Sequence, residues 1–159
     1  MTSRSATAEA SGLAPSDPVT SWDVALQTSP TVFYPKYGPL PAVVKVRHQP
    51  ATWDTVGFTR TLKLSDRSSV VETITDSTRG EFFAYDLSDF TRLFGMLVSG
   101  ARAEWTFTEE AEGTRIHWAY AFHPLPGRGW IVQAIVRFFW APYMRRVLPN
   151  IIGSIRLLR

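Results

Sequence analysis

The chain has 159 residues, enough for one domain with a hydrophobic core. It contains no cysteine, which excludes disulfide bonds, thiolate metal sites and cysteine nucleophiles. Its formal charge of +3 is too small to indicate nucleic-acid binding, and we expect none. Aromatic residues make up 13% of the chain, and because each one buries roughly 150–250 Å², the interior is either densely filled or lines a pocket for an apolar ligand.

The first 18 residues are rich in Ser, Thr, Ala and Pro and contain no apolar stretch. This composition predicts a disordered leader over residues 1–18, unlike a signal peptide, followed by a single domain over residues 19–158. No window reaches the roughly 18 consecutive apolar residues that a membrane span requires. We therefore expect no membrane span and a cytoplasmic protein.

The next segments carry mixed signals for strand and helix. Val19–Leu26 is interpreted as the first strand, and Ser29–Tyr37 is expected to form a short helix with Pro30 in its first turn. A Gly-Pro-Leu-Pro sequence ends that helix. Ala42–His48 then forms either a second helical turn or an extended piece.

From Gly57 to His123 apolar and polar residues alternate almost continuously, as they do in half-buried strands. The predicted strands are Gly57–Leu64, Val70–Thr75, Glu81–Leu87, Leu97–Thr108 and Thr114–His123. The irregular loop Ser88–Met96 interrupts them. We expect this loop to be a lid over a cavity, because its apolar residues, Phe90 and Phe94 among them, have no regular element in which to pack.

The C-terminal segment Trp130–Leu158 predicts a long amphipathic helix that is kinked or interrupted at Pro142 and Pro149. Several strands followed by one long helix predict an α+β fold, in which a curved antiparallel sheet wraps around that helix. Such a helix-grip arrangement usually encloses a cavity.

The order of these segments, together with four short stretches, resembles the SRPBCC superfamily of START and Bet v 1-like helix-grip proteins. Within it, the chain is most similar to the bacterial polyketide cyclase/dehydrase-like branch. The stretches are Gly57–Leu64, Val71–Ile74, Phe83–Tyr85 and Glu112–Trp118. The resemblance covers Val19–Leu158 and implies a seven-stranded antiparallel sheet, two short helices after the first strand, and a cavity for a hydrophobic small molecule. It does not imply one chemistry, because the superfamily contains cyclases, carriers and co-chaperone domains.

Strand parity places Arg60 and Glu72 on the apolar faces of neighbouring strands, in near-diagonal positions. Two charges directed into an apolar cavity are costly unless they pair. They are either a buried ion pair that stabilises the sheet or catalytic groups. In the catalytic alternative, Arg60 orients an anionic or carbonyl oxygen, Glu72 is an acceptor or general base, and the Tyr85 hydroxyl is a polar handle.

The remaining candidates are apolar and aromatic. They either form an ordinary packed core or line a pocket in which a planar ligand stacks. The expected ligand-binding residues are Leu62, Phe83, Trp105, Trp118, Tyr120, Phe90, Phe94 and Phe138.

No metal site or cofactor is expected. The three histidines are His48, His117 and His123, and the last two are six residues apart on the outward face of one strand. Six strand residues span about 20 Å, which is too far to share a metal ion.

The C-terminal third is locally positive, because seven arginines and no carboxylate follow Glu112. This charge is either a solvated helix face or a docking site for an acidic partner. The partner would be an acyl carrier protein or an anionic membrane surface, and the site would be the face of Arg137, Arg145 and Arg146.

Three functions remain open. The favoured one is a binding module that holds a hydrophobic small molecule, polyketide- or lipid-like, without altering it. The second is a cyclase or aromatase that acts on a poly-β-ketone tethered to a carrier protein, largely by shaping its substrate. The third is a protein-interaction role in which the basic face binds an acidic partner and the cavity is vestigial.

Overall fold

A computed structural model describes residues 4–158. In chain order the elements are β1 (Ala6–Ala14), α1 (Pro18–Gln27), α2 (Pro30–Phe33), β2 (Val43–Arg47), β3 (Thr59–Leu64), β4 (Ser69–Thr78), β5 (Phe82–Ser88), α3 (Arg92–Gly95), β6 (Val98–Glu110), β7 (Gly113–Pro124), α4 (Gly129–Ile135), the π-helical turn η1 (Val136–Trp140) and α5 (Ala141–Arg156).

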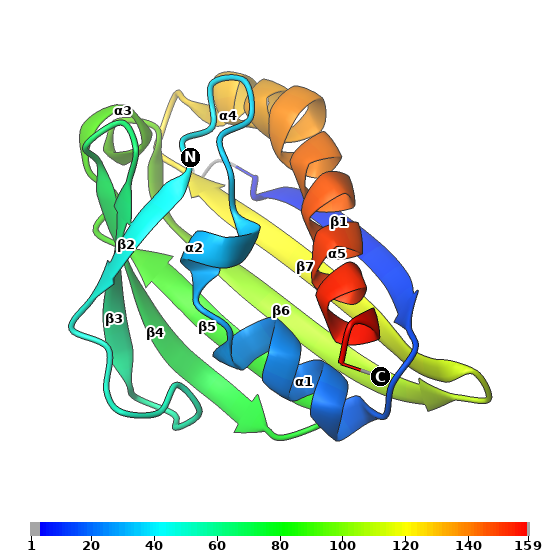
Figure 1. The fold of residues 1–159 in the computed structure, drawn as a ribbon. Coiled ribbons are helices and arrows are strands. Elements are labelled where there is room, and N and C mark those ends of the chain that lie inside the picture. Colours follow the sequence, from blue (N-terminus) through cyan, green and yellow to red (C-terminus); the bar gives the residue numbers. More distant parts are fainter. Residues whose placement is uncertain (1–3, 159) are drawn as a thin grey trace.

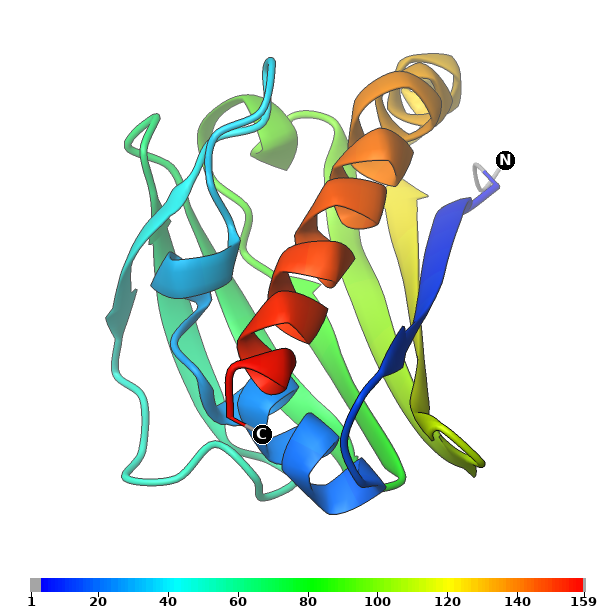
Figure 2. The same ribbon diagram turned by 45° about the vertical axis from the view of Figure 1, so that its right-hand side comes forward.

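Within these residues the strands form one seven-stranded sheet in the order β1-β7-β6-β5-β4-β3-β2, and every neighbouring pair is antiparallel. The sheet curves around α5, with α1 and α2 on the same concave side (Figures 1 and 2). The predicted α+β helix-grip fold is therefore confirmed. The five strands predicted between Gly57 and His123 are all present, with ends displaced by three residues or fewer.

The N-terminal segment contains the edge strand β1, so the prediction of a disordered leader over residues 1–18 is wrong. Residues 1–3 of the predicted leader lie outside the described part of the chain. β1 pairs with β7 from Ala6↔Phe122 to Ala14↔Thr114. Its inward residues are small because α5 passes close by: a Cβ added at Gly12 would lie 2.5 Å from Ile152 Cδ1. Small residues selected for close packing have the same composition as a disordered segment, which explains the error.

The predicted strand Val19–Leu26 is also wrong, because these residues lie in helix α1. Asp17 caps the helix by accepting a hydrogen bond from the Thr20 N–H at 2.9 Å, and Pro18 occupies the first turn. Trp22, Ala25 and Leu26 are buried at helical spacing. Two short helices thus follow the first strand as expected, but the strand is β1.

The other two N-terminal segments fit better. The helix expected over Ser29–Tyr37 is present but shorter, as α2, and begins at Pro30 as expected. Ala42–His48 takes the extended alternative, as β2.

The C-terminal helix is interrupted before Pro142, as predicted. Proline has no N–H to donate to the preceding turn, and the chain accommodates it with a π turn in which the Ala141 N–H donates to the Val136 carbonyl. By contrast, α5 continues through Pro149. Its inward face packs on the sheet through Tyr143, Met144, Val147, Leu148, Ile151 and Ile155. Within the described residues, no helix is long and apolar enough to cross a bilayer.

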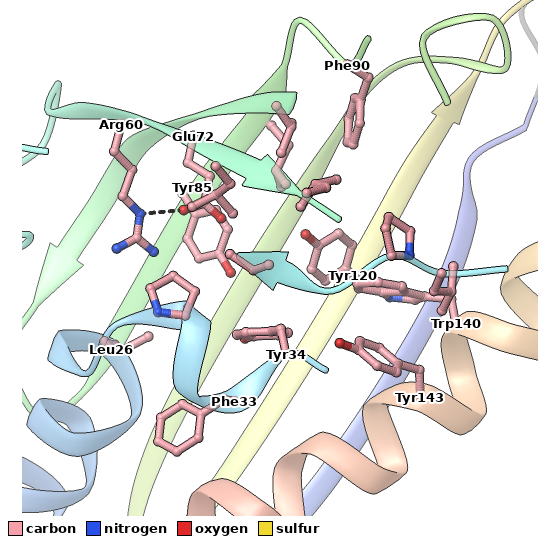
Figure 3. Close-up of a pocket in the computed structure, with 18 of the residues that line it drawn as sticks. Leu26, Phe33, Tyr34, Arg60, Glu72, Tyr85, Phe90, Tyr120, Trp140 and Tyr143 are labelled. Atoms are coloured by element: carbon pink, nitrogen blue, oxygen red, sulfur yellow. Dashed lines mark hydrogen bonds and ion pairs between the residues drawn. The ribbon is translucent and has the colours of Figure 1, made fainter. Parts of the chain in front are cut away.

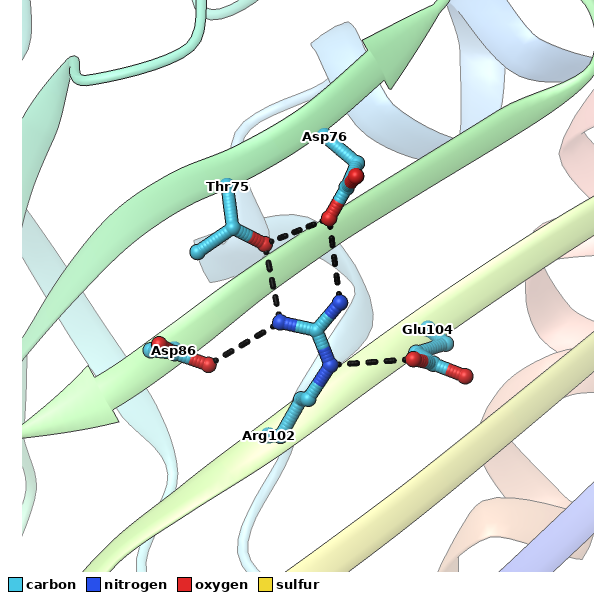
Figure 4. A network of polar contacts seen from close by, with 5 residues as sticks. All are labelled: Thr75, Asp76, Asp86, Arg102 and Glu104. Carbon is cyan, nitrogen blue, oxygen red and sulfur yellow. Dashed lines mark hydrogen bonds and ion pairs between the residues drawn. The ribbon is translucent and has the colours of Figure 1, made fainter.

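The outer face of the sheet carries a charged network centred on Arg102 of β6 (Figure 4). Its guanidinium donates to Asp76 at 3.0 Å, to Asp86 at 3.2 Å and to Glu104 at 2.9 Å. Thr75 bridges Arg102 and Asp76. These contacts join β4, β5 and β6 on the side of the sheet away from α5.

Candidate functional site: an aromatic cavity

A partly open cavity of about 110 Å³ lies between the sheet and the helices. Its lining residues come from strands β2 to β7 and from helices α1, α2, α3, η1 and α5 (Figure 3). Most of the lining residues are apolar or aromatic, and the exposed lining surface is mainly carbon. An engineered cavity of roughly 150 Å³ holds a benzene molecule. In this conformation the cavity therefore has room for a fragment of about one ring, and a larger ligand must displace side chains.

Most of the predicted site residues meet in this cavity. Those that line it are Arg60, Leu62, Glu72, Phe83, Tyr85, Phe90, Phe94, Trp105 and Tyr120. Trp118 does not line it; it is fully buried and stacks on Trp105 with ring centroids 4.7 Å apart.

Phe138 points outward and is 62% exposed, so it does not contribute to the cavity wall. In a regular helix it would share a face with Ile131 and Ile135. The buried residues of α4 and η1 are Val132 and Val136, so the face turned toward the sheet is a different one and Phe138 lies away from it. Trp140 takes the inward position instead.

The polar corner of the cavity is an ion pair between Arg60 and Glu72. The Arg60 Nε donates to Glu72 Oε1 at 2.7 Å, and the two side chains are only 8% and 5% exposed. The residues are direct partners across β3 and β4, which corrects the near-diagonal placement expected from the sequence. Gln49 and Trp53 hold the guanidinium from the other side: Arg60 Nη1 donates to Gln49 Oε1 at 3.0 Å, and Arg60 Cζ lies 4.2 Å from the Trp53 ring centroid.

Phenol groups surround this corner. Burial raises the pKa of Tyr85, and the negative charge of Glu72 raises it further. Burial likewise raises the pKa of Tyr34 and Tyr120 well above the usual value for tyrosine. These hydroxyls therefore stay protonated at neutral pH and can donate hydrogen bonds. The Tyr143 hydroxyl donates to the Pro35 carbonyl at 2.8 Å, which ties α5 to the segment after α2.

Sequence reasoning missed several lining residues. Tyr34 lies just after α2, in a segment whose faces cannot be assigned from a single turn. Trp140 and Tyr143 pack against each other with centroids 5.4 Å apart, and Trp140 also contacts Tyr120 at 4.7 Å. The spacing of Trp140, Tyr143 and Val147 at i, i+3 and i+7 is a helical signal that could have identified the inward face.

The histidines lie elsewhere. His117 Nε2 is 3.2 Å from Glu9 Oε2, and His123 Nδ1 contacts the Ser5 hydroxyl at 3.1 Å, both between β7 and the N-terminal edge. Among the described residues, no group of three or more His, Cys, Asp or Glu side chains is arranged to hold a metal ion.

Several solved structures share this fold. Ara h 8.0201 superimposes with a TM-score of 0.64 at 16% identity, over 96% of this chain and 99% of that one. Protein CV1439 from Chromobacterium violaceum gives a TM-score of 0.65 at 11% identity, over 94% and 96% of the two chains. The di-domain ARO/CYC StfQ from the steffimycin biosynthetic pathway gives 0.70 at 11% identity, over 95% of this chain and 50% of that one. At these identities the likeness shows the fold alone.

At the level of sequence, no curated protein matches the chain significantly. The family described as "Polyketide cyclase / dehydrase and lipid transport" matches residues 22–152, most of the chain. The protein therefore belongs to this polyketide cyclase/dehydrase and lipid-transport family, within the SRPBCC superfamily.

Proposed function

We propose that the protein binds a hydrophobic small molecule, polyketide- or lipid-like, in the cavity between the sheet and the C-terminal helix. The observation that carries the proposal is a partly open, aromatic-walled cavity with one charged pair, Arg60 and Glu72, in its wall. Small-molecule sites commonly combine apolar walls with a few oriented polar groups. The walls supply affinity by burying the ligand, and the polar corner selects its orientation.

The cavity also has a candidate lid. Phe90 and Phe94 line one end of it, with ring centroids 5.9 Å apart, and Phe94 packs on Phe122 at 6.1 Å. Asp89 precedes this segment and Arg92 lies within it, both with positive φ angles, 54° and 58°. Because a ligand larger than one ring must displace side chains, these two phenylalanines are the groups that we expect to move.

Native mass spectrometry of the purified protein, with organic extraction of any co-purifying molecule, tests the proposal. A fluorescent hydrophobic probe gives the quantitative assay. Val70→Trp should fill the cavity and weaken probe binding by at least about tenfold, whereas Val44→Trp adds the same ring to an exposed position of β2. Circular dichroism checks that both variants fold. Equal probe binding by the two variants would place the probe outside the cavity and contradict the proposal.

A second candidate function is ring closure of a poly-β-ketone, which the charged pair inside the cavity favours. The Glu72 carboxylate would take a proton from a methylene group between two carbonyls, while Arg60 stabilises the enolate oxygen. The enolate carbon then attacks another carbonyl carbon of the same chain and forms a C–C bond. The new alkoxide takes the Tyr85 proton, and the proton held by Glu72 returns to Tyr85 through solvent. The raised pKa of Tyr85 keeps this proton on the hydroxyl at neutral pH, so that it is available to the more basic alkoxide.

Glu72→Gln separates the two candidates, because Gln keeps the shape and an acceptor for Arg60. If the protein only binds its ligand, the variant should still bind the probe, and neither the wild type nor the variant should convert a tethered poly-β-ketone. Cyclisation predicts product formation by the wild type and its loss in the variant, read by mass and absorbance of the product.

The carrier protein in this second candidate would dock on Arg137, Arg145 and Arg146, which are exposed on η1 and α5. Arg145→Glu combined with Arg146→Glu should then abolish docking of an acyl carrier protein. Arg67→Glu, which changes an exposed arginine of the β3–β4 turn, is the control. Docking that survives the double reversal would exclude this partner site, and probe binding in the cavity should survive in either case.

A further inference from the structure

We propose that the end of the molecule formed by α3, α4 and η1 docks on the surface of an anionic lipid bilayer. The contact is a docking patch of four apolar side chains, Leu93, Met96, Trp130 and Phe138, together with Arg92, Arg128 and Arg137. This inference goes beyond ligand binding and does not depend on it.

The apolar members of the docking patch are mostly exposed to solvent. Leu93 is 64%, Met96 65%, Trp130 76% and Phe138 62% accessible. Single exposed apolar residues are ordinary on protein surfaces, but a group of large ones marks an interaction site. The other exposed large apolar residues include Val44 and Val56 on other elements, and Leu157 (85%) and Leu158 (68%) after α5, whose C-terminal end lies away from α3 and α4 (Figure 1).

The two parts of the docking patch lie at the same end of the fold. The Leu125 N–H donates to the Leu97 carbonyl at 2.9 Å, which joins the residue after Met96 to the turn that leads into α4. Both ribbon views place α3 and α4 at this end of the sheet (Figures 1 and 2). On α4 and η1, Trp130, Gln133, Arg137 and Phe138 are all exposed.

The same segments form one end of the cavity. Phe90 and Phe94, beside and within α3, face the cavity, as does Trp140 of η1. Each segment therefore has an apolar inner side, which lines the cavity, and an apolar outer side, which belongs to the docking patch. A bilayer bound there would lie against the lid phenylalanines.

The charge of the patch complements an anionic surface. Arg92, Arg128 and Arg137 are exposed, and no Asp or Glu occurs in residues 90–103 or 113–158. Asp89 is the exposed carboxylate next to α3. Arg4 adds a further cation nearby, since its carbonyl accepts a hydrogen bond from Gln133 of α4.

This combination fits a bilayer better than it fits a folded partner. Trp prefers the level of the lipid headgroups, where the indole ring is apolar and its N–H is wet, and Arg extends its charge toward phosphates while its stem lies on apolar surface. Trp130 and Phe138 with neighbouring Arg128 and Arg137 follow that pattern. An acidic protein would pair with the arginines. The apolar side chains come from two separate segments, and a bilayer can contact both at once because its hydrocarbon boundary is continuous.

Vesicle co-sedimentation tests the proposal without any cavity ligand. The full chain should bind vesicles of phosphatidylcholine mixed with phosphatidylglycerol, bind pure phosphatidylcholine vesicles more weakly, and lose affinity in high salt. Trp130→Ala with Phe138→Ala should lower the partition coefficient at least about tenfold. Arg128→Glu with Arg137→Glu should lower it about tenfold or more on the anionic vesicles. Val44→Ser with Val56→Ser removes exposed apolar groups elsewhere and should change nothing.

Three results would overturn the proposal. They are no binding to vesicles of either composition, vesicle binding that the patch variants leave unchanged, and a loss of vesicle affinity that is as large in the Val44/Val56 control. Binding of an acidic carrier protein through the patch, without vesicle binding, would assign the surface to a protein instead. The outcome is separate from the ligand proposal. A protein that binds vesicles but no hydrophobic probe would support only the docking patch, and a protein that binds the probe but no vesicles would support only the ligand site.

Discussion

Arg60 of β3 and Glu72 of β4 face each other directly across the sheet, and their 2.7 Å contact places both charges of an ion pair in the wall of an apolar cavity. Each charge is acceptable there because the other is present. The pair can therefore stabilise the sheet and also offer a ligand two oppositely charged groups, so the structural and functional interpretations are compatible.

The first prediction concerns this pair. Arg60→Met leaves the Glu72 carboxylate buried without its partner and should lower the free energy of unfolding by about 3–5 kcal/mol. The double variant Arg60→Met, Glu72→Leu should recover most of that loss, because no charge remains buried. Urea unfolding of the wild type, both single variants and the double variant measures the coupling energy. Strictly additive losses would mean that the two side chains stabilise the fold independently.

The second prediction is a loss of stability at high pH. Burial holds the pKa of Tyr34, Tyr85 and Tyr120 above the ordinary value, which is about 10 in the unfolded chain. Above that pH the unfolded state releases these protons and the folded state retains them, so stability is full below about pH 10 and falls as the pH rises. Unfolding as a function of pH, followed by tyrosinate absorbance, checks this. Tyr85→Phe should flatten the decline, and an equally steep decline in that variant would contradict the assignment.

The third prediction is a loss of stability at low pH. The hydrogen bond from Arg102 lowers the pKa of Asp76, with a further contribution from Thr75. The resulting stability is present above the unfolded pKa of about 4 and is lost as the pH falls through the lower folded value. Because Asp76 is half exposed, the effect should stay below about 1 kcal/mol. Asp76→Asn should remove this stabilisation above pH 4 and should hardly change the stability in strong acid. Acid-unfolding curves of the variant and the wild type make the comparison.

The fourth prediction concerns the lid. Phe90→Ala with Phe94→Ala opens one end of the cavity and should speed both entry and release of a fluorescent hydrophobic probe. Stopped-flow fluorescence measures both rates. Leu93→Ala, which removes an exposed apolar side chain of the same segment, is the control. Unchanged rates in the double variant would contradict the lid.

The fifth prediction concerns the contact between β1 and α5. Gly12→Ala places a methyl group 2.5 Å from Ile152 Cδ1 and should cost about 1–3 kcal/mol. Ile152→Val removes that atom and should restore part of the loss. Gly153→Ala adds a methyl group to open space on α5 and should be neutral or slightly stabilising. Thermal unfolding compares the variants; equal effects at Gly12 and Gly153 would contradict the close packing.

The sequence by itself determined the central sheet, the terminal helix and much of the cavity wall. Alternation of side chains along a strand is a local property, so the inward positions of Arg60, Glu72, Tyr85 and Trp105 could be predicted without knowing their neighbours. The missing N–H of Pro142 likewise marked a break in the helix.

Only the tertiary structure decided the rest. β1 is a strand because β7 pairs with it and α5 needs its small residues, and both elements lie about a hundred residues or more further along the chain. Trp140, and not Phe138, reaches the cavity because the helix turns its Val132 and Val136 face toward the sheet, and not the stripe of Ile131, Ile135 and Phe138. Contacts between distant segments leave no mark on local periodicity, and periodicity does not decide which of two apolar stripes at the start of a helix faces the sheet, so packing alone assigns both.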